Sequence, residues 1–296
     1  MVYLLTVTST ALSRSIAVAL ATLVTFGLVL LREATSPSGE GYWTAIAAAP
    51  AGDLYVADEG GRELRLVLHG GGYRRLGPLP RGIIRALAAD GANLLLATEG
   101  YLYVSNDTGA SWRRALSGRF TAVSLDGASA LAGAWADGLF RSDDGGSHWS
   151  RAAIPAGDSE FEVIVPGFAA TLLGLLETRD GGGSWSRVPG IPDRVTALSL
   201  TSGGLVRIGD WRGQVLDYNP ATRSVSQVAT FSGGVLAVTG SVVGTTNGVY
   251  PDNGGPLHRR EVTRIALSQD FYWAATARGP IYLSGDGHAW RLAYHR

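Results

Sequence analysis

The segment Ser142-Asp-Asp144-Gly-Gly146-Ser-His-Trp149 is the most informative part of the sequence, because it recurs along the chain. A second copy is Ser105-Asn-Asp107-Thr-Gly109-Ala-Ser-Trp112, and a third is Thr178-Arg-Asp180-Gly-Gly182-Gly-Ser-Trp185. A fourth copy, Ser284-Gly-Asp286-Gly-His-Ala-Trp290, is one residue shorter. A short motif that returns at a fixed period indicates a repeat architecture.

The period continues in weaker form outside these copies. Asp217 and Asp252 each lie in a turn-like stretch, DYNPAT and PDNGGP, and one step before Asp107 the sequence has three glycines, 70–72, followed by Tyr73. The aspartates at 107, 144, 180, 217, 252 and 286 are separated by 37, 36, 37, 35 and 34 residues. Seven turns imply seven repeats.

Each repeat carries the same pattern of short apolar runs, which is clearest in residues 119–153. FTAVSL is followed by ALAGAWA, then by a run that starts at Gly138 and leads into the motif, and a last short run starts at Trp149. Short alternating runs divided by Gly and Asp favour strands over helices. Four strands in about 36 residues are typical of a propeller blade. We therefore expect an all-β, seven-bladed β-propeller of four-stranded antiparallel blades over 43–296, with blades near 43–80, 81–117, 118–156, 157–193, 194–230, 231–260 and 261–296.

The motif resembles the Asp-box, or BNR repeat, whose pattern is Ser/Thr-x-Asp-x-Gly-x-x-Trp. The chemistry that its residues favour is structural, since an Asp in a tight turn accepts nearby backbone N–H bonds and a Gly supplies a positive φ. The Trp can be buried between blades. We expect turn clamps rather than metal ligands or catalytic acids at Asp107, Asp144, Asp180, Asp286, Trp112, Trp149, Trp185 and Trp290. In the family, such turns join the third and fourth strands, away from the functional face.

Composition excludes several classes of function. The 296 residues contain no Cys, so disulfides and thiolate chemistry are excluded, and 25 basic residues balance 25 acidic ones, which disfavours a nucleic-acid partner. The five His residues show no metal-binding spacing, and no GxxxxGK[ST] loop is present. We expect a monomeric propeller without a cofactor or metal.

The N-terminus forms a separate unit. Residues 15–31, SIAVALATLVTFGLVLL, are seventeen uncharged residues between Arg14 and Arg32, close to the lower limit for spanning a bilayer. They favour a transmembrane signal-anchor helix after a tail at 1–14 and before a linker at 32–42, with the propeller outside the cytoplasm. The alternative is a signal peptide that is cleaved to release a secreted protein.

A binding site is expected on the face that carries the second-to-third-strand loops and the links between blades, here called the funnel face. Arginines concentrate in those loops, while acidic residues are fewer, chiefly Glu59, Glu99 and Asp137. A guanidinium suits carboxylates and phosphates, although solvated loop arginines remain the alternative interpretation. The candidate binding residues are Arg81, Arg119, Arg194, Arg212, Arg260 and Arg278.

The Asp-box resemblance covers residues 43–296 and implies two kinds of function. Sialidases begin with an Arg-Ile-Pro signature, whereas Ile154-Pro155 here follows Ala153 and Ile191-Pro192 follows Gly190. The chain is more similar to the photosystem II stability/assembly factor family, which implies a non-catalytic scaffold for a protein client or an anionic or glycan ligand. The alternative is an exo-acting, sialidase-like glycoside hydrolase with a degenerate motif set.

Overall fold

The computed structural model describes residues 43–58, 63–251, 255–277 and 279–294. The tail, anchor and linker expected within residues 1–42 lie outside these ranges. Within them, no helix is long and apolar enough to cross a membrane.

The described chain is almost entirely β-structure, as its short apolar runs predicted. Its one helical turn is η1 (Pro50–Gly52). The first two blades consist of β1 (Trp43–Ala48), β2 (Leu54–Asp58), β3 (Leu64–Val67), β4 (Tyr73–Gly77), β5 (Ile84–Asp90), β6 (Asn93–Thr98), β7 (Tyr101–Ser105) and β8 (Arg113–Ser117). The third and fourth consist of β9 (Phe120–Asp126), β10 (Ser129–Ala134), β11 (Gly138–Ser142), β12 (Ser150–Arg151), β13 (Phe161–Val165), β14 (Phe168–Thr171), β15 (Gly174–Thr178) and β16 (Trp185–Arg187).

The remaining three blades complete the ring. They consist of β17 (Val195–Leu200), β18 (Val206–Asp210), β19 (Gln214–Asn219), β20 (Ser224–Thr230), β21 (Val235–Thr239), β22 (Val242–Thr245), β23 (Gly248–Tyr250), β24 (Val262–Ser268), β25 (Phe271–Thr276), β26 (Ile281–Ser284) and β27 (Arg291–Tyr294). The sixth blade therefore has three strands among the described residues, where four were expected. The other six sheets each have four.

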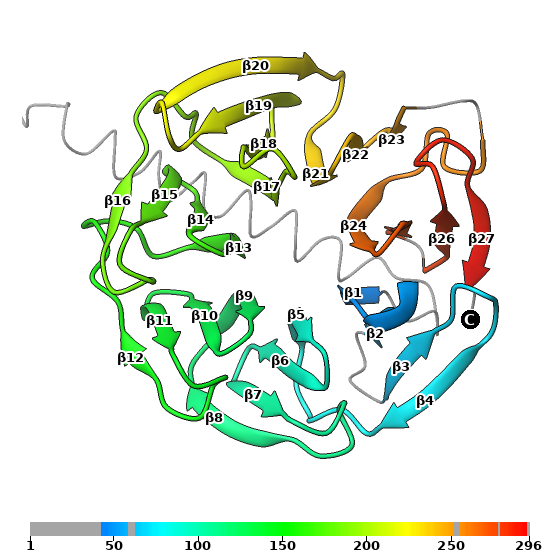
Figure 1. Ribbon diagram of the computed structural model, residues 1–296, viewed down its shortest axis with the longest axis horizontal. Coiled ribbons are helices and arrows are strands. Elements are labelled where there is room, and N and C mark those ends of the chain that lie inside the picture. Colours follow the sequence, from blue (N-terminus) through cyan, green and yellow to red (C-terminus); the bar gives the residue numbers. More distant parts are fainter. Residues whose placement is uncertain (1–42, 59–62, 252–254, 278, 295–296) are drawn as a thin grey trace, which may run out of the picture. The chain divides into compact units, whose positions relative to one another are not determined.

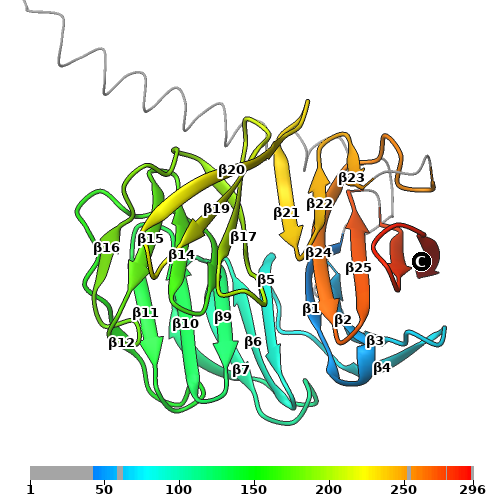
Figure 2. The same cartoon turned by 45° about the horizontal axis from the view of Figure 1, so that its top comes forward.

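Strands follow one another within each sheet in chain order and pair antiparallel. The first strand of every blade is innermost, and each contacts the first strands of the neighbouring blades, including β24 with β1, so the seven blades close into a ring (Figure 1). Figure 2 shows the inner strands standing side by side around it. The fold is a seven-bladed β-propeller.

The core lies between blades rather than at one centre. Leu95 and Leu102 of the second blade, for example, pack in one cluster with Phe120 and Ala132 of the third, and all four are fully buried. Apolar side chains on both faces of a sheet are buried because a blade has a neighbour on each side, which explains the near-continuous apolar runs of the middle strands.

The four aspartate turns join third to fourth strands and share one hydrogen-bond pattern. In the third blade the Ser142 hydroxyl donates to Asp144 at 2.7 Å, and Asp144 Oδ1 accepts the backbone N–H groups of Ser147 and His148 at 2.9 Å. The Trp149 indole N–H donates back to Gly146 O at 2.9 Å. Equivalent indole bonds are made by Trp185 and Trp290, while the buried Trp112 nitrogen has no such partner.

In the turns of the second and fourth blades, the glycine two residues after the aspartate fits against the preceding blade. A Cβ at Gly109 would lie 2.4 Å from Leu64 of the first blade, and one at Gly182 would lie 2.9 Å from Leu131 of the third. Both residues have positive φ, 81° and 95°. Glycine is required at these positions for two reasons, the left-handed backbone and the close approach of the neighbouring blade. These turns therefore help to position neighbouring blades.

The turn expected at Asp217 was placed two residues too early. Asp217 lies within β19, and its carboxylate forms two 2.9 Å contacts with the guanidinium of Arg207 on β18. Asn219 makes the turn instead, since its Oδ1 accepts the N–H groups of Ala221 and Thr222. Asp252, the next residue of the expected series, lies outside the described residues.

The ring closes between the last and first blades through side chains, because β1 and β24 belong to separate sheets. The Ser268 hydroxyl donates to Ala49 O, and Arg291 Nη2 donates to His69 O at 2.6 Å. The His69 ring also stacks on Phe271, with centroids 4.9 Å apart. No strand is exchanged between these two blades among the described residues.

Candidate functional site

A cavity of about 210 Å³ lies at the centre of the ring. The first strands of all seven blades line it, and these strands surround the centre in Figure 1. Its lining is mainly Ala, Val, Leu, Ile and Thr, with three charged side chains: Arg85, Glu162 and Arg264. Each first strand starts at a blade link, so these residues lie near the funnel face.

A β-bulge recurs at the same place in all seven blades. In the second blade, Ile84 pairs with Thr98 and Ala86 pairs with Ala97, so Arg85 between them has no partner of its own. The corresponding unpaired residues, in chain order, are Thr44, Arg85, Thr121, Glu162, Thr196, Leu236 and Thr263. A bulge bends a strand and redirects a side chain, which here shapes the start of each inner strand.

Threonine is the commonest residue at the bulge, and its hydroxyl has a structural task. Thr121 donates to Phe161 O of the next blade at 2.7 Å, and Thr196 donates to Val235 O of the next blade at 2.5 Å. These bonds link neighbouring inner strands. Arg85 and Glu162 replace this threonine with charged groups in two blades.

Glu162 and Arg264 face the cavity from the fourth and seventh blades. Both retain solvent-accessible surface because the cavity is open, but protein atoms surround them. Burial raises the pKa of the Glu162 carboxyl, which the charge of Arg264 partly offsets. Burial likewise lowers the pKa of Arg264, which Glu162 partly offsets. Each group therefore senses the other's charge.

An ion-pair network lies beside the cavity between the second and third blades. Glu99 Oε1 contacts Arg85 Nη2 and, at 3.2 Å, Arg119 Nη2. Burial would raise the pKa of Glu99, but its hydrogen bonds and charge interactions with the two arginines lower it. The Arg119 guanidinium also lies 5.1 Å from the centroid of the Trp135 ring. Glu99 thus neutralises part of the basic charge expected here.

Two further candidate arginines, Arg194 and Arg212, meet on the fourth and fifth blades. Trp211 N–H donates to Arg194 O at 3.2 Å, which connects a second-to-third-strand loop to a blade link. Arg194 adopts a left-handed backbone with φ 58°, and Arg212 pairs with Asp193 at 2.8 Å. Both arginines are exposed.

An apolar surface accompanies these arginines. Trp211 is 41% exposed and Leu173, on the second-to-third-strand loop of the fourth blade, is 49% exposed. The inner edge of the Trp211 ring lies against Gly234, where an added Cβ would be 3.2 Å from a ring carbon. The Arg194 N–H donates to Leu172 O at 3.0 Å, which brings the loop that carries Leu173 to the same blade link. We call Leu173, Arg194, Trp211 and Arg212 the Trp211 patch. An exposed Trp beside arginines is the composition enriched at protein interfaces.

The last candidate arginines lie elsewhere around the ring. Arg260 and its neighbour Arg259 line a polar cavity of about 500 Å³ together with Thr246, Glu261 and Thr276. Arg81 is exposed on the link between β4 and β5, and Arg278 lies outside the described residues. The structure therefore places the candidates at several points of the ring rather than in one cluster.

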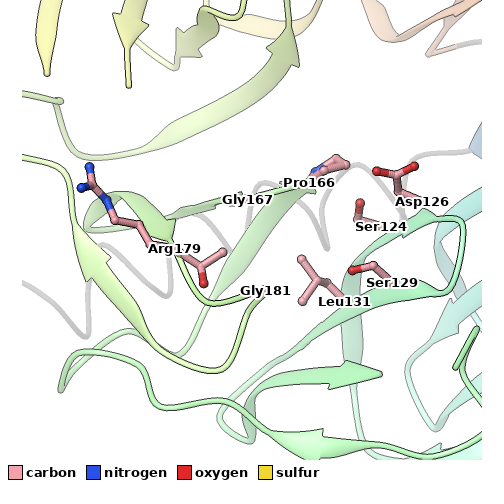
Figure 3. A pocket seen from close by; sticks show the side chains of 9 residues that line it. Ser124, Asp126, Ser129, Leu131, Pro166, Gly167, Arg179 and Gly181 are labelled. Atoms are coloured by element: carbon pink, nitrogen blue, oxygen red, sulfur yellow. The ribbon is translucent and has the colours of Figure 1, made fainter. Parts of the chain in front are cut away.

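A hollow of about 250 Å³ lies between the third and fourth blades at the opposite, aspartate-turn face (Figure 3). Ser124, Asp126 and Ser129 lie together on one side, and Arg179, which pairs with Glu177 at 3.2 Å, lies on the other. None of the described candidate arginines lines this hollow. Among the described residues, no group of three His, Asp or Glu side chains is arranged to hold a metal ion.

The sequence analysis missed Glu162, Arg264 and the cavity role of Arg85. A signal was present, because each is a charged residue near the start of an otherwise apolar first strand, as in FEVIV and IRALAAD. Such a residue must face either a neighbouring blade or the central cavity, and a charge is tolerated only in the cavity.

Neither the family models nor the curated proteins include a match to this chain. Solved propellers do match in fold. The extracellular domain of BT4673 from B. thetaiotaomicron has a TM-score of 0.65 at 17% identity, over 83% of this chain and 39% of that one. An ancestral GH74 enzyme has a TM-score of 0.67 at 15% identity, over 87% of this chain and 47% of that one. YCF48 bound to a D1 peptide has a TM-score of 0.62 at 14% identity, over 83% of this chain and 93% of that one.

These similarities establish the class, a seven-bladed β-propeller, and at such low identity they establish the fold alone. The chain spans about two fifths of the length of the BT4673 domain and less than half of the GH74 enzyme. The similar structures include a binding protein and an enzyme, so function has to be argued from the site.

Proposed function

We propose that this protein is a non-catalytic scaffold that works outside the cytoplasm and holds a protein partner on its funnel face. The observation that carries the proposal is the Trp211 patch, where a large aromatic ring and Leu173 are exposed beside Arg194 and Arg212. Trp and Arg contribute most of the binding energy at many protein interfaces.

The patch is organised before a partner arrives. The Trp211 backbone is held by its bond to Arg194 O and the Trp211 ring packs on Gly234, which reduces the side-chain freedom that is lost on binding. The Arg194 guanidinium, and that of Arg212 if a partner displaces Asp193, favour a partner segment that carries carboxylates beside an apolar anchor. YCF48, one of the similar structures, is bound to a D1 peptide, so this fold can hold a peptide.

The N-terminal sequence and the motif support the proposed location. An apolar segment at 15–31 would tether the propeller at the outer surface of a membrane, where tethering raises the local concentration of membrane-bound partners. The four aspartate turns also agree with the Asp-box resemblance, whose members include exported propellers. The BT4673 structure, which has a similar fold, is that of an extracellular domain.

Site-specific photocrosslinking tests the proposal. A photoreactive phenylalanine analogue replaces Trp211 or Leu173 in the full-length chain, and matched variants carry it at Leu200 or Val228, which are equally exposed but lie outside the patch. We expect one defined protein to crosslink at the two patch positions and not at the controls. Equal crosslinking at all four positions, or none at the patch, would refute the proposal.

An exo-acting glycoside hydrolase is the second candidate, because the pKa values of Glu160 and Glu162 are both raised, chiefly by burial. A raised pKa is the direction expected of a carboxyl group that acts as a general acid. Hydrolysis of fluorogenic glycosides or sialosides that disappears in Glu162→Gln would establish the enzyme. Absence of turnover by the wild-type protein would leave the non-catalytic scaffold as the proposed function.

A further inference from the structure

The seven equivalent bulges provide an internal comparison that singles out Glu162. Threonine occupies four of the seven positions, and the hydroxyls of Thr121 and Thr196 bind the next blade. The fourth blade gives up this interaction for a carboxyl group that faces the central cavity. The other bulges carry Thr, Leu or, in the second blade, Arg, so Glu162 is the acidic member of the set.

Glu162 and Arg264 lie in blades separated by three steps around a ring of seven, and therefore on nearly opposite walls (Figure 1). They do not touch, since no contact within 4.0 Å joins them in the described part of the chain. The Arg264 guanidinium donates to Thr263 O at 2.8 Å, and the Glu162 carboxyl has no hydrogen-bond or ion-pair partner among the described residues. Two opposite charges thus face each other across a gap.

The gap has the size of a small molecule. A volume of about 210 Å³ equals roughly seven water molecules at about 30 Å³ each. We propose that the cavity binds a small zwitterion of the ω-amino acid type, with its ammonium group on Glu162 and its carboxylate on Arg264. Its methylene chain would lie against the Ala, Val and Leu side chains of the inner strands.

Arg85, the third charged side chain of the lining, is paired with Glu99, so Glu162 and Arg264 set the charge pattern. This pattern favours a zwitterion over simple anions or cations. A dianion would place one negative group near Glu162, and a diamine would place one positive group near Arg264. In an α-amino acid a single carbon atom separates the ammonium nitrogen from the carboxylate carbon, which is the shortest separation in this class and the poorest match to groups on nearly opposite walls. A zwitterion with several atoms between its charges fits both walls.

Calorimetry and thermal shift on the full-length protein test the proposal with glycine, β-alanine, 4-aminobutyrate and 5-aminovalerate. Succinate and 1,4-diaminobutane serve as single-sign controls. We expect saturable binding that is absent for glycine and tightens with the longer zwitterions. Glu162→Gln and Arg264→Gln should each weaken the best ligand at least tenfold while retaining the wild-type circular dichroism spectrum. If either variant fails to fold, Leu236→Glu, which alters another cavity position, replaces it and should also weaken binding.

The outcomes separate this inference from the scaffold function. Arg212→Gln, in the Trp211 patch, should leave zwitterion binding unchanged, and Glu162→Gln should leave crosslinking at Trp211 unchanged. Binding of succinate but of no zwitterion would overturn the proposal in favour of an anion site. Failure of every compound to bind wild type, or equal binding by Glu162→Gln, would also overturn it.

Discussion

The indole nitrogen of Trp273 donates a 3.0 Å hydrogen bond to the carbonyl oxygen of Gly52, 221 residues earlier in the chain. Trp273 is fully buried in the last blade, and Gly52 ends the helical turn of the first. This bond connects two blades that share no sheet, so it contributes directly to closing the ring.

Replacing Trp273 with Phe should lower stability by about 2–4 kcal/mol, because the hydrogen bond and part of the buried volume are lost and Gly52 O is left without its donor. Urea unfolding measures the change. The matched control is Trp211→Phe, at an exposed ring, which should change stability by no more than about 0.5 kcal/mol. Equal effects of the two substitutions would contradict a role in closure.

Neighbouring glycines in the fourth-blade turn should differ in their tolerance of a side chain. Both have positive φ, but a Cβ at Gly181 would meet nothing within 4 Å, whereas one at Gly182 would lie 2.9 Å from Leu131. Gly181→Ala should cost about 1 kcal/mol for the left-handed backbone. Gly182→Ala should cost about 1–3 kcal/mol more, because Leu131 must move. Thermal unfolding distinguishes the two, and a similar loss for both would show that blade contact is unimportant.

Asp144→Ala should lower the melting temperature without removing partner binding at the funnel face. Its carboxylate accepts two backbone N–H bonds and the Ser142 hydroxyl, so the turn loses several bonds together. Asp143→Ala is the control, since Asp143 pairs only with the exposed side of Arg141 at 2.7 Å. Binding lost from a fully folded Asp144→Ala protein would instead indicate a functional carboxylate.

The aspartate turns should also make the fold sensitive to acid. Hydrogen bonds from the Ser111 hydroxyl and backbone N–H lower the pKa of Asp107 to about 2, and the backbone N–H groups of Ala289 and His288 lower that of Asp286 to about 2. A pKa lowered by folding gives stability that is present above the unfolded value, 3.8, and is lost as the pH falls towards 2.

Urea midpoints of wild type and Asp107→Asn across this range measure the effect. The variant should be less stable than wild type near neutral pH, and the difference should shrink as the pH falls from about 4 to about 2. A difference that stays constant over the range would show that ionisation of Asp107 does not stabilise the turn.

The fold could be predicted because its determinants are local. The turn at Asp144 needs only residues 142–149, so its residues are adjacent in the sequence and recur with the blade period. Where the motif is incomplete, the spacing of the aspartates alone predicted the wrong position for the turn. Asp217 matched the spacing, but its pairing with Arg207 across two strands kept it in a strand, and Asn219 supplied the turn.

The site was harder to predict because it depends on ring closure. Arg212 and Arg194 were found from their loops, and Trp211 lies beside Arg194 because the β17–β18 pairing of the fifth blade continues into the Trp211 N–H bond to Arg194 O. Glu162 and Arg264 are about a hundred residues apart and meet across a cavity that exists only when all seven inner strands surround it. The bulge that directs Glu162 is a property of strand register, which the apolar pattern does not reveal.

The contiguity of every sheet makes the propeller modular. Because each blade is formed by a single uninterrupted segment and the seam between β27 and β1 contains no shared strand, a circular permutant that joins those ends and opens at any other link would keep all seven sheets intact. Because no strand is shared at the seam, backbone hydrogen bonds within a sheet do not hold the first and last blades together, just as they do not hold any other pair of neighbouring blades together. Growth or loss of a whole blade would then require only duplication or deletion of one such segment.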